Sequence, residues 1–386
     1  MIRKIVLSHF LLMFGYKLFS AYFALYLVER GLVLSQIGYS YFFIYIAFVL
    51  FAPVVGILSN RFSPVFLSGV GISGYALYSL GMIAVSPGLP FYFLQVMLGC
   101  SAALFFVSSR AMLIESELVH HDAAFGWFYS APIYANFIAP IIGGIILYFF
   151  GFFGVFIASI LIYLLNILLR AIHKGEYIAS HHAAHAHIGD LKNYLSIFKR
   201  IKERGLLNIL ILSFAMLIVD GFYSSFFILF LKDRGLSQSE IITYVGVFSA
   251  ALVPISLITV RFLKKAIVSG GIFWGGFIHA ASTFVIGAMG YKLPLSGLLF
   301  VNTSKSFSDF MMNSRRSGAI SKEFPEHAIE AGVVDTIFAP LGVALGALIG
   351  GFIVSTFGFQ VLFITGAAIV LIVTLLVSLF ANKNSD

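Results

Sequence analysis

The sequence has few charged residues and almost no cysteine. Only 10% of its 386 residues are Asp, Glu, Lys or Arg, whereas 60% are hydrophobic and the mean hydropathy is +1.01. Soluble domains carry about 25% charged residues, so this composition excludes an ordinary soluble domain and predicts a chain that lies in a lipid bilayer. The single cysteine, Cys100, lies within an apolar run, which excludes a disulfide framework within the chain.

Motifs of nucleotide-dependent and hydrolytic chemistry are also missing. The sequence contains no Walker loop, no dinucleotide-binding glycine fingerprint, no H-E-x-x-H and no nucleophile elbow. Neither an ATP-driven pump nor a membrane enzyme is therefore expected, and no cofactor is expected. The apolar runs are long and continuous rather than short and alternating, which favours membrane helices over a membrane barrel.

Twelve membrane-spanning helices fit the apolar runs. A span needs about 20 apolar residues, and the loops between these runs are short. The sequence thus predicts an all-α membrane protein built from two six-helix bundles. The expected spans are residues 5–28, 36–58, 65–86, 91–117, 125–150, 152–172, 206–231, 237–260, 267–290, 294–318, 329–354 and 359–381.

The positive charges are distributed unevenly between the two sides of these spans. If the N-terminus is inside, 17 of the 24 Lys and Arg residues are cytoplasmic, four are outside and three lie within spans. This asymmetry predicts a multi-pass protein of the cytoplasmic (inner) membrane with both termini in the cytoplasm. It also accounts for the net charge of +8 without nucleic acid as a partner, and a monomer is expected.

One long polar stretch divides the chain into residues 1–172, 173–205 and 206–386. The middle part carries apolar residues on one helical face and basic residues opposite, which favours an amphipathic helix on the inner leaflet, although a solvated linker is the alternative. The run His181 to His187 has an i, i+4 spacing that could hold a metal ion. No cysteine or acidic pair supports that reading, so no metal site is expected.

The two outer parts are related in sequence. Residues 23–37 and 227–241 share eight identities at a shift of 204, including an Arg-Gly-Leu triplet. Small residues of 135–144 map onto Gly342, Gly346, Gly350 and Gly351 at a shift of 207. Two matches at nearly one offset indicate duplication, and parallel repeats place a substrate site at the repeat interface near the bilayer midplane.

Three motifs resemble those of the major facilitator superfamily. The loop from Gly56 to Pro64 is similar to that family's G-x-L-x-D-R-x-G-R loop, with Asn60 in place of Asp and Arg61 retained. The resemblance implies a conformational latch, which loses one charge here, although Asn60 can still cap a helix start.

The second motif is A-N-F-I-A-P-I-I-G-G, from Ala135 to Gly144, which resembles an antiporter motif of the family. Pro140 would bend this helix, and Gly143 and Gly144 would allow close packing, which is the plain structural reading. The third is Gln95-Val-Met-Leu-Gly99, where drug/proton antiporters of the family carry R-x-x-x-G. The missing arginine counts against standard drug/proton antiport.

Charged residues within spans are costly and point to a central cavity. Lys17 and Asp220 lie mid-span at nearly equivalent positions of the repeat, and we expect both to face the cavity, paired or acting as a gate or proton site. Lys305 and Asp309 are spaced i, i+4 and can pair on one helix face or contact an anion and titrate. Tyr16 and Tyr223 lie at the same level.

A second set of charges is expected to form an inner gate near the cytoplasmic side. Its members are Arg110, Glu115, Glu117, Arg315, Arg316 and Asp335. Arg110 could instead bind an anion at the cavity floor. His9 and His279 are each single histidines in spans, which favours hydrogen-bonded packing residues over proton relays.

These features predict a secondary transporter that moves a small solute by alternating access. Proton- or ion-coupled export of an amphiphilic molecule is the expected activity, because the antiporter-like motif and the aromatic content favour it. The alternatives are uptake or exchange of an organic anion, a lipid or lysolipid flippase, and a transport-inactive membrane sensor on the same fold.

Overall fold

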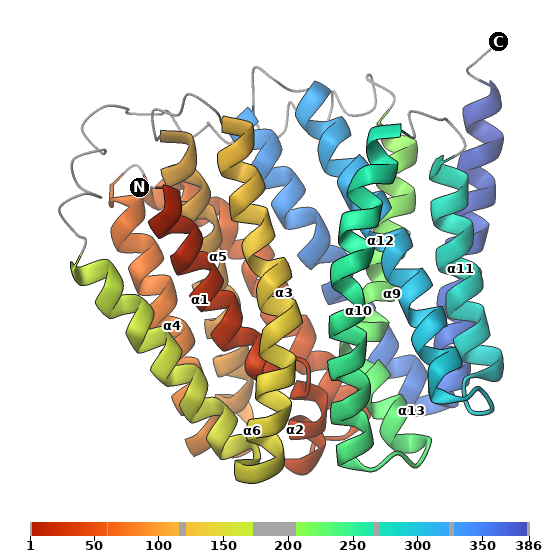
Figure 1. Cartoon of the computed structure of the whole chain (residues 1–386), viewed down its shortest axis with the longest axis horizontal. Helices are drawn as coiled ribbons and strands as arrows, with labels where there is room; N and C mark the ends of the chain where they lie inside the picture. The colour runs from red at the N-terminus through yellow and green to blue at the C-terminus, as the bar shows by residue number, and fades with distance from the viewer. Residues whose placement is uncertain are drawn as a thin grey trace. The chain divides into compact units, whose positions relative to one another are not determined.

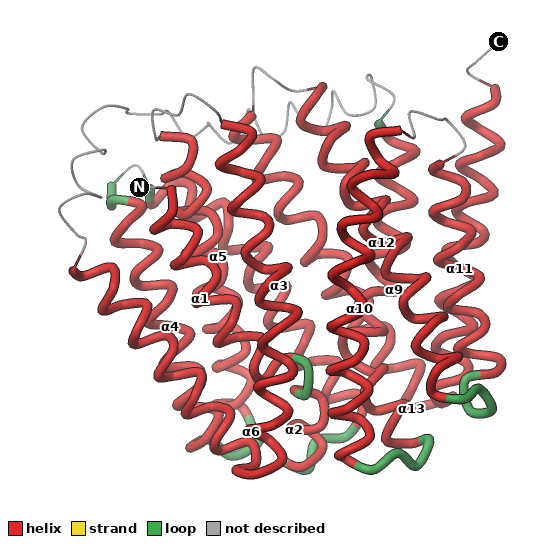
Figure 2. Tube along the Cα trace, viewed as in Figure 1, coloured by secondary structure: helices red, strands yellow, loops and turns green. Residues whose placement is uncertain are grey.

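The computed structural model consists of helices joined by short loops (Figure 1). It describes residues 2–59, 61–115, 121–172, 206–265, 271–323 and 328–383, and these residues form helices and short loops without a strand (Figure 2). The helices are α1 (Ile2–Ser20), α2 (Phe23–Glu29), α3 (Leu34–Leu58), α4 (Pro64–Ala84), α5 (Leu89–Glu115), α6 (His121–Ile172), α9 (Leu207–Asp233), α10 (Gln238–Lys265), α11 (Gly271–Met289), α12 (Leu295–Glu323) and α13 (Ala328–Lys383).

Two of these elements are pairs of helices joined across a kink. Gly151 within α6 has φ 63° and ψ −169°, and Gly358 within α13 has φ 82° and ψ 177°. Glycine tolerates this backbone because it lacks a Cβ atom. Both kinks fall at predicted span boundaries. Six described helices are long and apolar enough to cross a membrane, or seven if α1 and α2, bent by 45°, form one span, so the count of twelve spans stays a prediction.

The chain divides into two compact units. Unit 1 contains Met1–Leu32 and Phe43–Asp190, and unit 2 contains Val33–Phe42 and Leu191–Asp386. In unit 1, α1 packs against α6, and α4 packs against α5 and α6. In unit 2, α9 packs against α13, α11 lies against α12 and α13, and α10 lies against α12. The predicted linker, including its amphipathic helix and its histidine run, lies outside the described residues.

The predicted internal repeat is visible in how α2 and α9 end. Each helix is followed by a glycine with positive φ, Gly31 at 84° and Gly235 at 91°. In both places the glycine amide bonds the carbonyl three positions back, and the next amide bonds the carbonyl five positions back. This is the Schellman arrangement, which caps a helix through a left-handed glycine.

The arginine before each of these glycines also bonds an equivalent backbone carbonyl in each unit. Arg30 donates to the Val85 carbonyl oxygen at 2.5 Å, and Arg234 donates to the Leu293 carbonyl oxygen. Both carbonyls belong to a loop between two later helices of the same unit. The sequence match at a shift of 204 therefore corresponds to the same helix end, with the same kind of bond to a loop, in both units.

Glycines of the second repeated motif allow two helix pairs to pack closely. A Cβ atom on Gly143 in α6 would lie 2.0 Å from the Leu18 carbonyl oxygen, and one on Gly346 in α13 would lie 2.0 Å from the Ile218 carbonyl oxygen. Such contacts are far inside van der Waals distance, so only glycine fits at these positions. Pro140 lies inside α6, where its carbonyl oxygen accepts a hydrogen bond from the Tyr22 hydroxyl at 2.8 Å. Gly144, which follows Gly143 in the chain, is also buried.

We expect Gly143→Ala to destabilise the protein, because the new methyl group must displace the α1 backbone. Overpacking of this kind costs about 1–3 kcal/mol. Gly69→Ala in α4 is the matched control: a Cβ atom there meets nothing within 4 Å, and alanine gains about 0.5–1 kcal/mol over glycine in a helix. Thermal unfolding in detergent measures both, and equal melting temperatures would contradict the close-packing interpretation.

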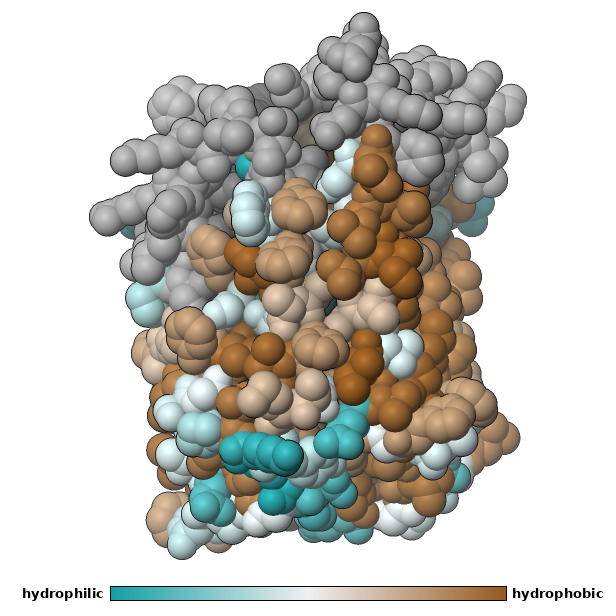
Figure 3. Space-filling view, turned by 90° about the vertical axis from the view of Figure 1, so that its right-hand side faces the viewer, coloured by the Kyte–Doolittle hydropathy of each residue, from teal (hydrophilic) through white to brown (hydrophobic). Residues whose placement is uncertain are grey.

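Large apolar side chains remain exposed along the helices. Figure 3 shows hydrophobic residues over much of the face it presents, with hydrophilic residues gathered toward its lower end. Phe300, Phe352 and Leu379 are among the exposed side chains, at 73%, 65% and 68%. Apolar surface of this extent is unfavourable in water and fits contact with lipid.

Candidate functional site

Three helices of unit 2 bring four titratable side chains together. Asp220 comes from α9, His279 from α11, and Lys305 and Asp309 from α12. We refer to these four residues as the charge cluster. Of the three helices, α9 and α11 are apolar and α12 is more polar. Few groups around the cluster can solvate charge, so its members stabilise one another.

Lys305 is the centre of the charge cluster. Its ammonium donates to Asp220 Oδ1 and, at 2.7 Å, to Asp309 Oδ2. Its Nζ atom also lies 4.3 Å from the centroid of the Tyr223 ring, in a cation–π contact. The Lys305–Asp309 pair that the sequence predicts within α12 is thus present. Asp220 of α9 is a second carboxylate partner of Lys305.

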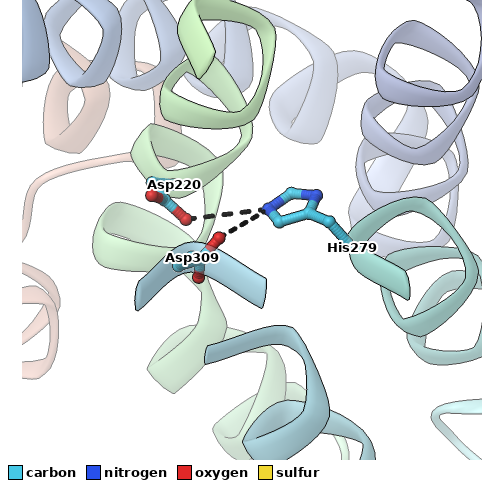
Figure 4. Close-up of side chains that lie close together, drawn as sticks. All are labelled: Asp220, His279 and Asp309. Carbon is cyan, nitrogen blue, oxygen red and sulfur yellow. Dashed lines mark ion pairs between the residues drawn. The ribbon is translucent and has the colours of Figure 1, made fainter. Parts of the chain in front are cut away.

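His279 approaches the two carboxylates from α11, as Figure 4 shows. Its Nε2 atom lies 3.2 Å from Asp309 Oδ1 and 3.9 Å from Asp220 Oδ1. The imidazole is fully buried, and neither ring nitrogen has a hydrogen bond of good geometry. A buried polar group of this kind is costly unless a proton or a ligand completes its bonding.

The four side chains differ in their access to solvent. The exposed fractions are 23% for Asp220 and 18% for Asp309, against 5% for Lys305 and zero for His279. The two carboxylates are therefore half-buried, while the two basic groups are enclosed.

The formal charges of the cluster do not cancel. With a neutral imidazole, one ammonium and two carboxylates give a net charge of −1. A single proton, on His279 or on a carboxylate, brings the net charge to zero. In a low-dielectric site this difference has a large energetic effect. The cluster is therefore suited to taking up and releasing one proton.

The same side chains resemble a cation site in their geometry. Asp220, His279 and Asp309 each offer one ligand atom, and these atoms lie within 4.8 Å of one another. The Lys305 ammonium already bridges the two carboxylates. A metal ion would have to replace that ammonium, so the arrangement favours proton chemistry over metal binding.

Aromatic rings form one wall of the cluster. Tyr223 stacks on Phe227 with a centroid distance of 5.5 Å and lies 5.1 Å from Phe363. Phe227 in turn lies 5.9 Å from Tyr244. Packed rings of this kind hold Tyr223 in place over Lys305 and exclude water from that side.

A second ion pair lies further along α12 and joins it to α13. Arg316 Nε in α12 lies 3.0 Å from Asp335 Oδ1 in α13, and Ser317 donates to Asp335 Oδ2 at 2.8 Å. Arg316 also donates to Asn313 and lies over the Phe338 ring. This pair joins two of the predicted gate residues within unit 2, and its role as a gate stays a prediction.

The other predicted gate residues are only partly described. Arg110 in α5 and Arg315 in α12 are half-buried. Glu115 ends α5, but its side chain lies outside the described part, as does the whole of Glu117. No gating contact of these four residues is therefore established.

The predicted latch loop lies at the end of α3. Gly56 is buried within the helix and Arg61 is exposed in the following turn, whereas Asn60 lies outside the described residues. The suggestion that Asn60 caps the next helix is wrong: Ser63 is the N-cap of α4, and its hydroxyl accepts from the Phe66 amide at 3.2 Å. Serine directly before Pro64 has the extended backbone that an N-cap requires.

Three predicted residues of unit 1, Lys17, Tyr16 and Gln95, are not members of the charge cluster. Lys17 in α1 is half-buried, and its Nζ atom lies 5.5 Å from the Tyr16 ring centroid. Its predicted pairing with Asp220 would join the two units and stays a prediction. Gln95 is buried in α5 and accepts from the Tyr78 hydroxyl at 3.1 Å, so a neutral amide takes the place of the antiporter arginine.

Two histidines that look alike in the sequence differ in the structure. His9 Nδ1 lies 3.0 Å from the Phe128 carbonyl oxygen among Phe rings, as expected of a packing residue. His279 faces the carboxylates instead, which sequence reasoning missed. Nothing local to position 279 could have indicated this, because its partners lie 30 and 59 positions away.

Comparison with known proteins agrees with this architecture. The chain superposes on a D-xylose–proton symporter with a TM-score of 0.73 and 14% identity, covering 97% of this chain and 96% of the other. It superposes on a POT family transporter in complex with 5-aminolevulinic acid (TM-score 0.74, 14% identity, 100% and 96% covered) and on a nucleoside transporter (0.68, 16%, 98% and 98%). A comparison with curated protein sequences finds no match. The sequence profile of the Major Facilitator Superfamily matches residues 5–330, and the chain therefore belongs to that superfamily of membrane transporters.

Proposed function

We propose that this transporter couples the movement of a small amphiphilic solute to one proton, and that the charge cluster of unit 2 carries that proton. The observation that supports this is the unbalanced charge around Lys305: two carboxylates and one ammonium, with a buried imidazole beside them. The charge is −1 without a proton and zero with one. A site that faces first one side of the membrane and then the other makes this change at a lower free-energy cost when its net charge is zero.

The contact between His279 Nε2 and Asp309 Oδ1 is the place where the proton is held. These atoms lie 3.2 Å apart, and Asp309 Oδ1 has no other hydrogen-bond partner. Asp220 Oδ1 and Asp309 Oδ2 are both engaged by Lys305. A proton between the imidazole and the free carboxylate oxygen satisfies the two remaining groups at once.

The superposed structures are consistent with a coupled transporter, since one of them is a proton symporter by its description. At 14% identity that likeness supports the fold, and the coupling argument rests on the charge cluster. The expected direction, export, rests on the antiporter-like motif in α6. The orientation with both termini in the cytoplasm rests on the charge asymmetry.

The test is proton movement in liposomes that contain the purified full chain and an internal pH dye. Sugars, dipeptides, nucleosides, organic anions and organic cations are added in turn. We expect one class to change the internal pH, and the sign of the change gives the direction of coupling. If a class exchanges across the membrane without any pH change, the coupling proposal is wrong. If no class exchanges, the sensor alternative gains support.

A matched pair of histidine variants tests the position of the proton. His279→Gln removes the basic group that faces Asp309, and a charge-assisted contact of this kind contributes about 1.5–3 kcal/mol. We therefore expect the solute-dependent proton flux to fall by about tenfold or more. His9→Gln changes the other buried membrane histidine, which packs in unit 1, and should leave the flux per folded protein unchanged. Equal fluxes in the two variants would remove His279 from the mechanism.

A further inference from the structure

The contact proposed to hold the proton joins two different helices. His279 lies in α11 and Asp309 in α12, and the Nε2 and Oδ1 atoms of this pair are 3.2 Å apart. Charge-assisted hydrogen bonds between nitrogen and oxygen are strongest at about 2.7–2.9 Å, so a small change in this distance has a large effect. The proton affinity of the pair therefore depends on how closely α12 is held to α11.

A buried serine ties the two helices together beside this contact. Ser308, which directly precedes Asp309 in α12, is fully buried, and its hydroxyl donates to the Gly275 carbonyl oxygen of α11. In an α-helix the carbonyl of residue 275 is also the acceptor for the backbone N–H of residue 279. Ser308 is thus bonded to the same turn of α11 that carries His279, and it is the chain neighbour of Asp309.

Gly275 also allows α12 to approach α11 closely. A Cβ atom on Gly275 would lie 2.8 Å from the Sδ atom and 2.9 Å from the Cγ atom of Met312. Met312 is buried, and it follows Asp309 by three residues, which is about one helical turn. The residues of α12 on either side of Asp309, Ser308 before it and Met312 after it, therefore both meet α11 at Gly275.

We propose that Ser308 and Gly275 are positioning residues of the proton site: they fix the distance between His279 and Asp309, and so set the pH at which this pair takes up its proton. This rests on the proposed transport function. Neither positioning residue carries a charge, and both act through the contact between the two helices. A longer distance weakens the stabilisation of a protonated imidazole by the carboxylate, so the pair then takes up its proton only at a lower pH.

The other charged groups around His279 are the same whether or not this helix contact is altered. From α9, Asp220 Oδ1 lies 3.9 Å from its Nε2 atom, and the Tyr223 ring lies over Lys305, the one ammonium of the charge cluster. The third helix packed on α11 is α13, which has no Asp, Glu, Lys, Arg or His from residue 336 to residue 382. A variant that alters only the contact of α11 with α12 therefore reports on distance.

The test is a pH titration of His279 in the whole chain in detergent micelles, followed by NMR of isotopically labelled histidine side chains. The signal of His279 is the one that is absent from His279→Gln. We expect Ser308→Ala to lower the midpoint of this titration by about 0.5–1 pH unit. Ser304→Ala is the matched control in α12: that hydroxyl donates to the Phe300 carbonyl oxygen of its own helix at 2.9 Å, so its loss should leave the midpoint unchanged.

Two neighbouring glycines provide a second test, which also covers the case in which Ser308→Ala does not fold. The new methyl group of Gly275→Ala must displace the buried Met312 side chain of α12, so the midpoint should again fall. The methyl group of Gly276→Ala points to α13 instead, where a Cβ atom would lie 2.2 Å from Thr374 Oγ1. Gly276→Ala should therefore lower the melting temperature without moving the midpoint.

Equal midpoints for the two serine variants, or for the two glycine variants, would overturn the proposal. That result differs from a failure of the proposed function, because the titration needs neither a solute nor a pH gradient. If His279 of the unaltered protein does not titrate between about pH 5 and 9, the proton is not held at this contact and both proposals are wrong. If His279 titrates there and the matched variants agree with each other, only the positioning role is wrong.

Discussion

The Asp309→Asn substitution is expected to separate solute movement from proton movement. With asparagine at this position, Lys305 and Asp220 balance each other, and the cluster is neutral without a proton. The transporter then no longer needs to bind a proton before its site changes from facing one side of the membrane to facing the other. We expect exchange of labelled solute across a membrane to continue, whereas accumulation driven by a pH gradient is lost.

The size of this effect follows from the driving force. One proton moving down a gradient of one pH unit supplies about 1.4 kcal/mol, which sustains at most about a tenfold solute gradient at one-to-one coupling. The unaltered protein should approach this ratio, and Asp309→Asn should fall to a ratio of about one. Both quantities are measured in the same liposomes, by pH-driven accumulation and by counterflow.

Asp233→Asn is the matched control for this experiment. It makes the same chemical change in the same unit, at the end of α9, where Asp233 accepts a hydrogen bond from Tyr291. It should accumulate solute as the unaltered protein does. Continued accumulation by Asp309→Asn would show that the proton is carried elsewhere, and a loss of both accumulation and counterflow would show that Asp309 is needed for transport itself.

The parts of this cluster that are local in sequence could be predicted, and the parts that depend on helix packing could not. Lys305 and Asp309 are four residues apart on one helix, and helix geometry alone brings them together. Asp220 is 85 positions from Lys305, so their contact depends on how α9 and α12 pack. The sequence predicts that Asp220 faces the cavity, with Lys17 as one expected partner, and both of these stay predictions.

His279 shows the same limit more clearly. A single histidine on an apolar helix carries no local sign of its partner, and its neighbours in α11 are small or apolar. Only the packing of α11 against α12 brings its ring to Asp309. His9 occupies a similar sequence environment and meets a backbone carbonyl instead. Residue type and spacing could not separate the two.

Features of the fold with a strong local cause were predicted well. The Arg-Gly pairs at residues 30–31 and 234–235, which the sequence shows as part of the repeat, lie just beyond predicted spans that end at 28 and 231, and their glycines adopt the positive φ of a helix end. The breaks at Gly151 and Gly358 fall between predicted spans for the same reason. The cap of α4 was misplaced by three residues, because asparagine and serine are both good caps and the sequence does not show which one precedes the first turn.

Loss of Lys305 is expected to be the most destabilising single change in unit 2. Its buried ammonium is the shared partner of Asp220 and Asp309, so Lys305→Met leaves two half-buried carboxylates with no cation between them and a net cluster charge of −2. Removing one partner of a buried ion pair costs about 3–5 kcal/mol. We expect a drop of that size in the free energy of unfolding, measured by denaturant titration in detergent micelles.

Restoring the charge balance should recover much of this loss. In the double variant Lys305→Met with Asp220→Asn, the cluster charge returns to −1, and an amide replaces the carboxylate that was left unpaired. We expect at least half of the lost stability to return, so the double variant should be more stable than Lys305→Met alone. Additive losses would indicate that Lys305 stabilises the unit through packing on Tyr223 rather than through charge.

Lys232→Met provides the control for removing a lysine from this unit. Lys232 is exposed near the end of α9, and surface substitutions of this kind change stability by about 0.5 kcal/mol or less. The contrast between positions 232 and 305 isolates the effect of burial between two acids. If the two single variants lose equal stability, Lys305 is not the centre of a buried charge cluster, and the proton-coupling argument built on its unbalanced charge fails with it.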